Sequence, residues 1–98
     1  MQIVLIAEFE VSVRPNGEPA LAFHHVIRDR TVATFELAAA QELRDLLAIE
    51  QKRIRVVGGC QVIFGAGGDL TIYSPNGQRA VYLNDFQAGQ LSALLQSI

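Results

Sequence analysis

FELAAAQELRDLL (residues 35–47) returns 48 residues later as LNDFQAGQLSALL (residues 83–95). In both stretches an apolar anchor residue precedes an apolar stripe with the spacing of an amphipathic helix. The match continues upstream, and its spacing changes only in turns, where insertions are tolerated. We interpret the chain as a single domain, residues 1–98, in which one structural unit occurs twice, over residues 1–49 and 50–98.

Three strands and one helix are expected in each repeat. Gln2–Val13 alternates apolar and polar residues with the period of two that marks a half-buried strand. Arg53–Phe64 is the equivalent strand of the second repeat, and its Gly58-Gly59 pair indicates a bulge or a sharp bend. We predict an α+β fold with an antiparallel sheet, built from duplicated β-β-β-α units related by pseudo-twofold symmetry.

If the first strand of each repeat is continuous, alternation decides which face each side chain occupies. Ile3 and Leu5 then share the core face with Phe9, and Ile54 and Val56 share the core face of the second repeat. The side chains that fall on the opposite, outer face are His24, Arg28, Arg55 and Tyr73.

Two amphipathic helices are predicted, over about residues 37–50 and over residues 85–98. Asn84, with Gln87 three residues later, matches the pattern of a capping box before the second helix. The outer positions of that helix are small and uncharged, so a neighbouring molecule can approach without burying an unpaired charge. We therefore expect a homo-oligomer formed through helix 85–98. The outer positions are Ser92, Ala93, Gln96 and Ser97.

The formal net charge of −2 gives no general attraction to nucleic acid or to an anionic membrane, so any nucleic-acid site must be a local patch. The second repeat has the more basic balance and is the better candidate for binding polyanions. The single cysteine, Cys60, predicts a reducing compartment and hence a cytoplasmic location. The apolar run Ile3–Ala7 is too short for a signal peptide or a membrane span.

The order of elements and several short motifs resemble a known family. A strand ending in VSVR (residues 11–14), then a Gly-containing turn, a second strand, a loop, a short strand and a helix resemble the positive-cofactor-four-like family of single-stranded-DNA-binding transcriptional regulators. The second repeat resembles it through DLTIYSPN (residues 69–76) and AVYL (residues 80–83). Two such units in one chain resemble the Whirly proteins, whose chain carries a unit of four strands and a helix twice. Each predicted unit here is about one strand shorter.

This resemblance implies a curved antiparallel sheet that binds extended single-stranded nucleic acid on its outer face, without a cofactor, in transcription regulation. Aromatic rings would stack on bases, while Lys and Arg neutralise phosphates. The structural alternatives are that the tyrosines are cross-strand packing partners and that the charges after the first helix are a solvated helix end. The residues that fit the binding role are Lys52, Arg53, Arg55, Tyr73, Arg79 and Tyr82 in the second repeat and Arg28 in the first.

No group of residues in the sequence indicates catalysis or metal binding. His24 and His25 are adjacent in a predicted strand, so their side chains point to opposite faces and do not chelate one metal. Cys60 has the parity of a core residue, where a thiol is inert. The run Gly65–Gly68 precedes a strand rather than a helix, which makes it a hairpin turn and not a phosphate loop. We expect a non-enzymatic protein.

A second hypothesis belongs to a different class of function. The net charge and the acidic residues Glu8, Glu10 and Glu18 favour a protein-binding or inhibitory module that acts through an apolar, acidic surface as a homo-oligomer. Titration of labelled single-stranded DNA distinguishes the two hypotheses.

Overall fold

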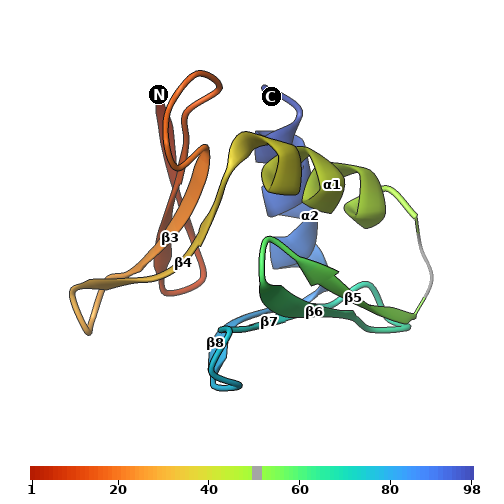
Figure 1. Ribbon diagram of the computed structural model, residues 1–98. Coiled ribbons are helices and arrows are strands. Elements are labelled where there is room, and N and C mark those ends of the chain that lie inside the picture. The colour runs from red at the N-terminus through yellow and green to blue at the C-terminus, as the bar shows by residue number, and fades with distance from the viewer. Residues whose placement is uncertain (50–51) are drawn as a thin grey trace.

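Two antiparallel four-stranded sheets, each followed by one helix, make up the computed structural model, which describes residues 1–49 and 52–98 (Figure 1). The α+β fold with duplicated units is confirmed. The first repeat contains β1 (Gln2–Ile6), β2 (Phe9–Val13), β3 (Leu21–His25), β4 (Arg30–Phe35) and α1 (Leu37–Leu47). The second repeat contains β5 (Arg53–Val57), β6 (Cys60–Phe64), β7 (Leu70–Tyr73), β8 (Arg79–Leu83) and α2 (Asp85–Leu95).

Each repeat has four strands instead of the predicted three, because its first predicted strand is a hairpin. Ala7 and Glu8 form a two-residue turn between β1 and β2, with a φ of +54° at Ala7. Gly58 and Gly59 form the turn between β5 and β6, with φ values of +58° and +83°, the signs of a type I′ turn. The glycine pair therefore reverses the chain and does not bulge it.

The two-residue turns change the faces on which β1 and β5 present their side chains. Across such a turn an even-numbered residue pairs with an odd-numbered one, and paired residues share a face. Ile3 and Leu5 consequently lie on the outer face, 54% and 63% exposed. Ile54 and Val56 are exposed in the same way. Placing these four residues in the core was wrong, because the alternation changes phase at the turn.

The two sheets share an irregularity at equivalent positions. The register between β3 and β4 shifts between Phe23 and His24, and the register between β7 and β8 shifts between Ile72 and Tyr73. These residues match at the same 49-residue spacing in the sequence. A shared β-bulge is a specific backbone feature, so the repeats agree in local geometry as well as in element order.

Each helix packs against strands of both repeats. α1 contacts β4 of its own repeat and β5 of the other, and α2 contacts β8 of its own repeat and β1 of the other. The helices also contact each other, and the Arg44 guanidinium of α1 donates a hydrogen bond to the carbonyl oxygen of Ile98, beyond the end of α2. Figure 1 shows the helix pair in the angle between the two sheets. The two repeats therefore bury their apolar faces together.

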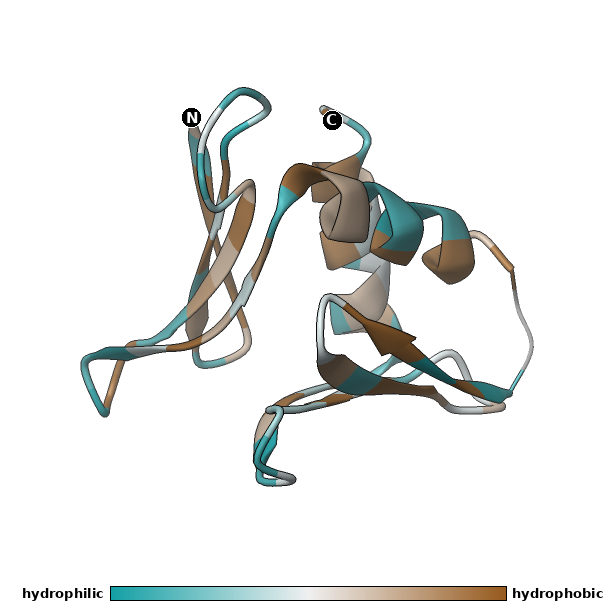
Figure 2. Cartoon of the chain, viewed as in Figure 1, coloured by the Kyte–Doolittle hydropathy of each residue, from teal (hydrophilic) through white to brown (hydrophobic). Residues whose placement is uncertain are grey.

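Three phenylalanine rings pack together in the core of the first repeat, whereas Phe64 is the aromatic residue buried in the described core of the second. The ring of Phe23 lies edge-to-face with those of Phe9 and Phe35, with ring centroids 6.2 and 6.3 Å apart. In Figure 2 hydrophobic residues follow the strands and helices, and the hairpin tips are mostly hydrophilic. The equivalent buried positions of the second repeat hold Cys60, Ile72 and Leu83.

The predicted capping box at the start of α2 is confirmed. The Gln87 N–H donates to Asn84 Oδ1 over 2.9 Å, and the Asn84 N–H donates to Gln87 Oε1 over 3.0 Å. Both helices end earlier than predicted, at Leu47 and Leu95. Glu50, the predicted end of the first helix and first residue of the second repeat, lies outside the described residues. Within residues 1–49 and 52–98, no helix has the length and apolar character needed to cross a membrane.

Candidate functional site

The outer face of the second sheet carries both tyrosines. The register pairs Gln61 with Tyr73 and Thr71 with Tyr82, while Ile72, between them, is buried on the opposite face. Tyr73 and Tyr82 therefore lie on one face of the neighbouring strands β7 and β8, and the predicted outward display of Tyr73 is confirmed. We call this surface the tyrosine face. It consists of Ile54, Val56, Gln61, Ile63, Thr71, Tyr73, Arg79 and Tyr82.

The tyrosine face exposes ring and aliphatic surface to solvent. Tyr82 is 45% exposed and Val56 is 70% exposed, whereas Tyr73 is half-buried by its neighbours. Neither tyrosine ring stacks on another aromatic ring in the part of the chain that the structure describes. An unstacked ring on a flat sheet is a platform on which a base can stack, with little dependence on base identity.

The equivalent surface of the first sheet has different chemistry. Where the tyrosine face has Tyr73 and Tyr82, the outer face of the first sheet has His24 and Thr34. Its centre carries Glu10, which repels phosphate. The repeats therefore agree in backbone geometry but not in surface character, and among the described residues both tyrosines lie in the second repeat.

A hollow of about 200 Å³ lies between the β3–β4 turn and the β7–β8 turn. Arg28 and Arg30 line it from the first repeat, and Arg79 lines it from the second. Within residues 1–49 and 52–98, none of these three guanidinium groups has a carboxylate partner within 4.0 Å. We call this hollow the arginine groove. Its other lining residues are Thr31, Val32, Ser74, Asn76, Gln78 and Ala80.

The two histidines brace the turn that carries Arg28. His24 Nε2 lies 3.0 Å from Asp29 Oδ1, and the backbone N–H of Arg28 donates to His25 Nδ1 over 3.2 Å. His24 lies on the outer face, whereas the ring of His25 lies on the inner face, edge-to-face with Phe9 at 5.3 Å between centroids. The prediction that the two histidines occupy opposite faces is confirmed.

The β7–β8 turn on the other side of the groove is held by its own side chains. Asn76 Oδ1 accepts hydrogen bonds from the Ser74 hydroxyl and, over 3.2 Å, from the N–H of Gln78. The backbone N–H of Ser74 donates to the Gln78 carbonyl oxygen over 2.8 Å. These hydrogen bonds within an Asx-type turn restrain the chain on this side of the groove, which lowers the entropic cost of binding there.

Arg79 belongs to both the tyrosine face and the arginine groove. It is the cross-strand partner of Tyr73 at the β-bulge, and it lines the groove together with Arg28 and Arg30. An aromatic ring and a guanidinium group are thus adjacent, and two further guanidinium groups continue the positive charge. The structure brings together four of the predicted site residues, which are Arg28, Tyr73, Arg79 and Tyr82.

The other three predicted residues do not join this surface. Arg53 pairs with Phe64 and Arg55 with Val62, which are inner-face residues, so the predicted outward display of Arg55 was wrong. The cause is the same change of phase at the Gly58-Gly59 turn. Arg55 Nη1 donates to the Ile54 carbonyl oxygen over 2.9 Å. Lys52 is exposed ahead of β5.

Arg30 is the residue of the groove that sequence reasoning did not select. Arg28 and Arg30 flank Asp29 in the tip between β3 and β4, and Asp29 has a φ of +51°. Two arginines on either side of a turn residue stay at the same hairpin tip, so the Arg-Asp-Arg spacing was a usable signal. No sequence pattern indicated that Arg79 of the second repeat lies near Arg28 and Arg30 of the first. Their proximity depends on how β4 and β8 pack against each other.

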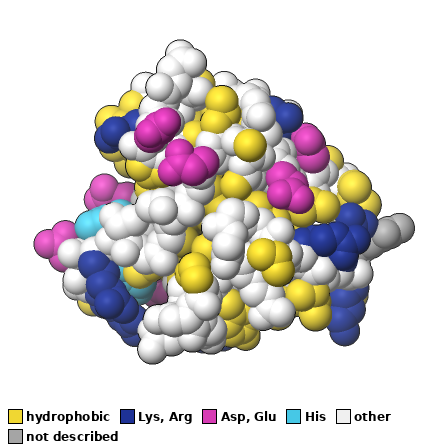
Figure 3. All heavy atoms as spheres, viewed as in Figure 1, with side chains coloured by type: hydrophobic (Ala, Val, Ile, Leu, Met, Phe, Trp, Pro, Cys, Tyr) yellow, Lys and Arg dark blue, Asp and Glu magenta, His cyan; other side chains and the backbone are white. Residues whose placement is uncertain are grey.

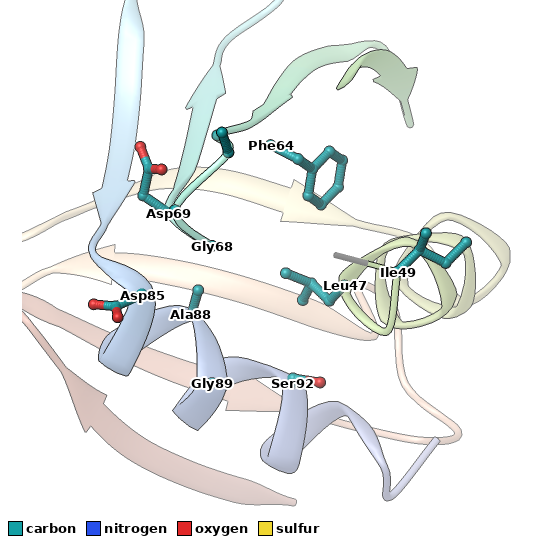
Figure 4. A pocket seen from close by; sticks show the side chains of 12 residues that line it. Leu47, Ile49, Phe64, Gly68, Asp69, Asp85, Ala88, Gly89 and Ser92 are labelled. Atoms are coloured by element: carbon teal, nitrogen blue, oxygen red, sulfur yellow. The ribbon is translucent and has the colours of Figure 1, made fainter. Parts of the chain in front are cut away.

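A larger hollow of about 520 Å³ lies between the end of α1, the β6–β7 turn and α2 (Figure 4). Leu47 and Phe64 form apolar wall, while Asp69 and Asp85 place carboxylates at one side. Its described lining residues include no Lys or Arg. Two carboxylates without a cation repel a polyanion, so this hollow is not a phosphate site.

Basic and acidic side chains are interspersed on the face of the molecule that Figure 3 shows. In Figure 3 the Lys and Arg side chains form separate groups with acidic side chains between them, and no continuous basic belt crosses this face of the molecule. Such a distribution gives weak long-range steering of a charged ligand.

The remaining reactive groups lie in structural positions. Cys60 is buried, and this burial raises the pKa of its thiol above the ordinary value. The run Gly65–Gly68 is a hairpin turn, as predicted, and the N–H of Gly65 donates to the Asp69 carbonyl oxygen over 2.9 Å. Within residues 1–49 and 52–98, no three His, Cys, Asp or Glu side chains gather closely enough to hold a metal ion.

Comparison of the chain with protein-family models, curated proteins and solved structures found no match. The tyrosine face and the arginine groove are therefore the candidate functional surfaces of the described chain.

Proposed function

We propose that this chain is a non-enzymatic protein that binds single-stranded nucleic acid. Bases stack on Tyr82 and Tyr73 of the tyrosine face, and the sugar–phosphate backbone follows Arg79 into the arginine groove. The single observation that carries the proposal is the position of Arg79, which pairs with Tyr73 in the sheet and also lines the groove with Arg28 and Arg30. Stacking platforms beside a cationic groove are the two parts that such binding needs.

The energetics of this site are modest. Stacking on an aromatic ring contributes about 1–3 kcal/mol per base. Each phosphate contact on a single strand contributes about −0.7 to the slope of log K against log salt concentration, so three arginines give a slope of about −2. Because the net charge of −2 opposes binding at long range, we expect affinity to be measurable at low salt and to fall steeply with added salt.

The element order supports the family resemblance as part of the same proposal. The Whirly-like pattern has four strands and a helix in each of two units, and the sequence alone predicted about one strand fewer in each unit. The structure has four strands and a helix in each repeat. A role in transcription regulation and a cytoplasmic location, the latter from the single cysteine, are further parts of the proposal.

The test is fluorescence anisotropy with a labelled oligo(dT) strand at low and moderate salt. Arg79→Gln should weaken binding by about tenfold and reduce the salt slope by about 0.7. Tyr82→Leu should weaken binding by about fivefold or more, with the salt slope unchanged, because stacking is not an ionic interaction.

Matched controls separate these contacts from general effects of charge and hydrophobicity. Arg55→Gln removes the same charge from the opposite face of the same sheet and should leave affinity within about twofold. Phe86 of α2 is 73% exposed, and Phe86→Leu removes its ring and should also leave the affinity for the DNA strand unchanged. No binding by the wild-type chain at low salt, or equal losses in Arg55→Gln and Arg79→Gln, would contradict the proposal.

Protein binding is a second candidate function, favoured by a specific observation. The strand β1 exposes Ile3, Val4 and Leu5 at 54%, 39% and 63%. Such a run of exposed apolar residues on a sheet edge is a recognised interaction surface.

A further inference from the structure

The edge of the first sheet has an unusual composition. β1 lies at the end of its sheet, with β2 on one side and no strand on the other. Its sequence QIVLI contains no charged residue, and Gln2–Leu5 are all exposed. Sheet edges in soluble proteins are usually protected by charges, proline, bulges or a covering segment, because free N–H and C=O groups invite another strand. Among the described residues of β1 there is no charge, proline or bulge, and although α2 contacts β1, the side chains of Gln2–Leu5 remain exposed.

The other sheet edges of the described chain differ from β1. β4 and β8, the last strands of the two sheets, contact each other. β5, the first strand of the second sheet, carries Arg53 and Arg55. A second copy of β5 laid antiparallel against it would bring like charges together, which is destabilising. An uncharged β1 meets no such repulsion from its own copy.

We propose that β1 pairs antiparallel with β1 of a second copy of this chain, joining the two first sheets into one sheet across a twofold axis. A second copy fits this edge because β1 contains no charge that its own copy would repel, and because the register that follows is self-complementary.

The hydrogen-bonding pattern of the hairpin fixes which backbone groups are free. Ile6 and Phe9 close the two-residue turn and form a hydrogen-bonded pair. Because hydrogen-bonded pairs alternate along an antiparallel ladder, the N–H and C=O groups of Ile3 and Leu5 point away from β2, toward the open edge. These two residues are the ones that a second strand must reach.

One register of two antiparallel β1 strands pairs the outward-pointing N–H and C=O groups of both Ile3 and Leu5. A twofold axis at Val4 places Val4 opposite its own copy, and places Ile3 of each chain opposite Leu5 of the other. Both Ile3–Leu5 pairs are then hydrogen-bonded pairs, and their side chains lie on the same, outer face of the joined sheet. In the dimer, the exposed side chain of Ile3 in each chain is partly covered by Leu5 of the other chain.

The contact is small compared with a stable interface, which buries about 1,200–2,000 Å². We therefore expect a reversible dimer that forms at micromolar or higher concentration and dissociates on dilution. This surface is separate from the tyrosine face and from the arginine groove, so dimerisation does not depend on nucleic-acid binding.

Sedimentation equilibrium over a range of concentrations tests the proposal. Leu5→Lys should raise the dimer dissociation constant by at least tenfold, because it places two ammonium groups near each other across the twofold axis. The matched control is Val56→Lys, at the equivalent position of β5 and similarly exposed, which should leave the constant unchanged. Circular dichroism establishes that both variants are folded.

Cysteine cross-linking tests the register. In a Cys60→Ala background, Val4→Cys should form a disulfide-linked dimer under mild oxidation, because directly opposed residues have Cβ atoms about 5 Å apart. Ile3→Cys should cross-link much more slowly, since its copy lies diagonally beyond the reach of about 7 Å for a disulfide.

Three outcomes would overturn the inference. They are a monomer at all concentrations, a dimer that survives Leu5→Lys, and a dimer lost in Ala93→Arg but not in Leu5→Lys. The last result would place the contact on helix 85–98, which was the expectation from sequence. In the structure Leu91, Leu94 and Leu95 of that helix are buried within the chain, and Ala93 is exposed.

Discussion

Truncating one core leucine in each helix tests whether the two repeats share a single core. Leu43 of α1 and Leu91 of α2 occupy equivalent positions, 48 residues apart, and both are 0% exposed. A buried Leu→Ala change costs about 2–5 kcal/mol, from lost apolar transfer and the cavity left behind. Because each helix packs on strands of both repeats, we expect Leu43→Ala and Leu91→Ala to destabilise the whole chain by similar amounts.

Urea denaturation followed by far-ultraviolet circular dichroism measures the effect. Each variant should unfold in a single transition, with an unchanged m-value and a lower midpoint. A loss of about 3 kcal/mol corresponds to a fall in Tm of about 12–24 °C for a domain of this size. Leu46→Ala is the control, since Leu46 is only half-buried and should cost less. Two separate transitions, with half of the signal lost at the wild-type midpoint, would refute the shared core.

Four further predictions concern single positions. Ala7→Gly should stabilise the chain by about 1 kcal/mol in urea denaturation, because Ala7 has a φ of +54°, a conformation that costs a non-glycine residue about 1–2 kcal/mol. Gly58→Ala should destabilise it, since the added Cβ would lie 3.0 Å from Ala39 Cβ at a φ of +58°, whereas Gly67→Ala meets no atom within 4 Å; equal stabilities of the two variants would contradict this. Cys60 should react with iodoacetamide at pH 8 far more slowly in the native protein than in urea, because burial raises the pKa of the thiol and leaves less thiolate; equal rates would show an accessible thiol. Asn84→Ala should cost about 1 kcal/mol through loss of the capping box, whereas Ser92→Ala should cost little, and similar midpoints would contradict the cap's role.

The sequence allowed prediction of the duplication, the helix positions and the cap at Asn84, because each depends on local spacing or on a direct match between repeats. It did not reveal the hairpins within Gln2–Val13 and Arg53–Phe64. Ala7 and Glu8 are not typical turn residues, and β1 is apolar on both faces, so its alternation carried no information on phase. The Gly58-Gly59 pair was recognised, but it was interpreted as a bulge or a sharp bend within one strand and not as the turn of a hairpin.

The candidate site was predictable in part for the same reason. Tyr73 and Tyr82 follow the Gly58-Gly59 turn, and beyond this turn the predicted alternation places side chains on the correct face. Arg55 precedes the turn and was assigned to the wrong face. The arginine groove was beyond sequence reasoning, because it forms between hairpin tips of different repeats. Contacts between repeats depend on packing, which a single sequence does not encode in any local pattern.

The reciprocal packing of the helices has a consequence for how such a chain can diversify. A protein with only one repeat would have to form a homodimer to cover its helix, and every change in sequence would then appear twice. Joining two units in one chain keeps their effective concentration high and frees each copy to change separately. Because the two units are joined, one half can keep a cluster of three phenylalanines inside while the other places two tyrosines on its outer face.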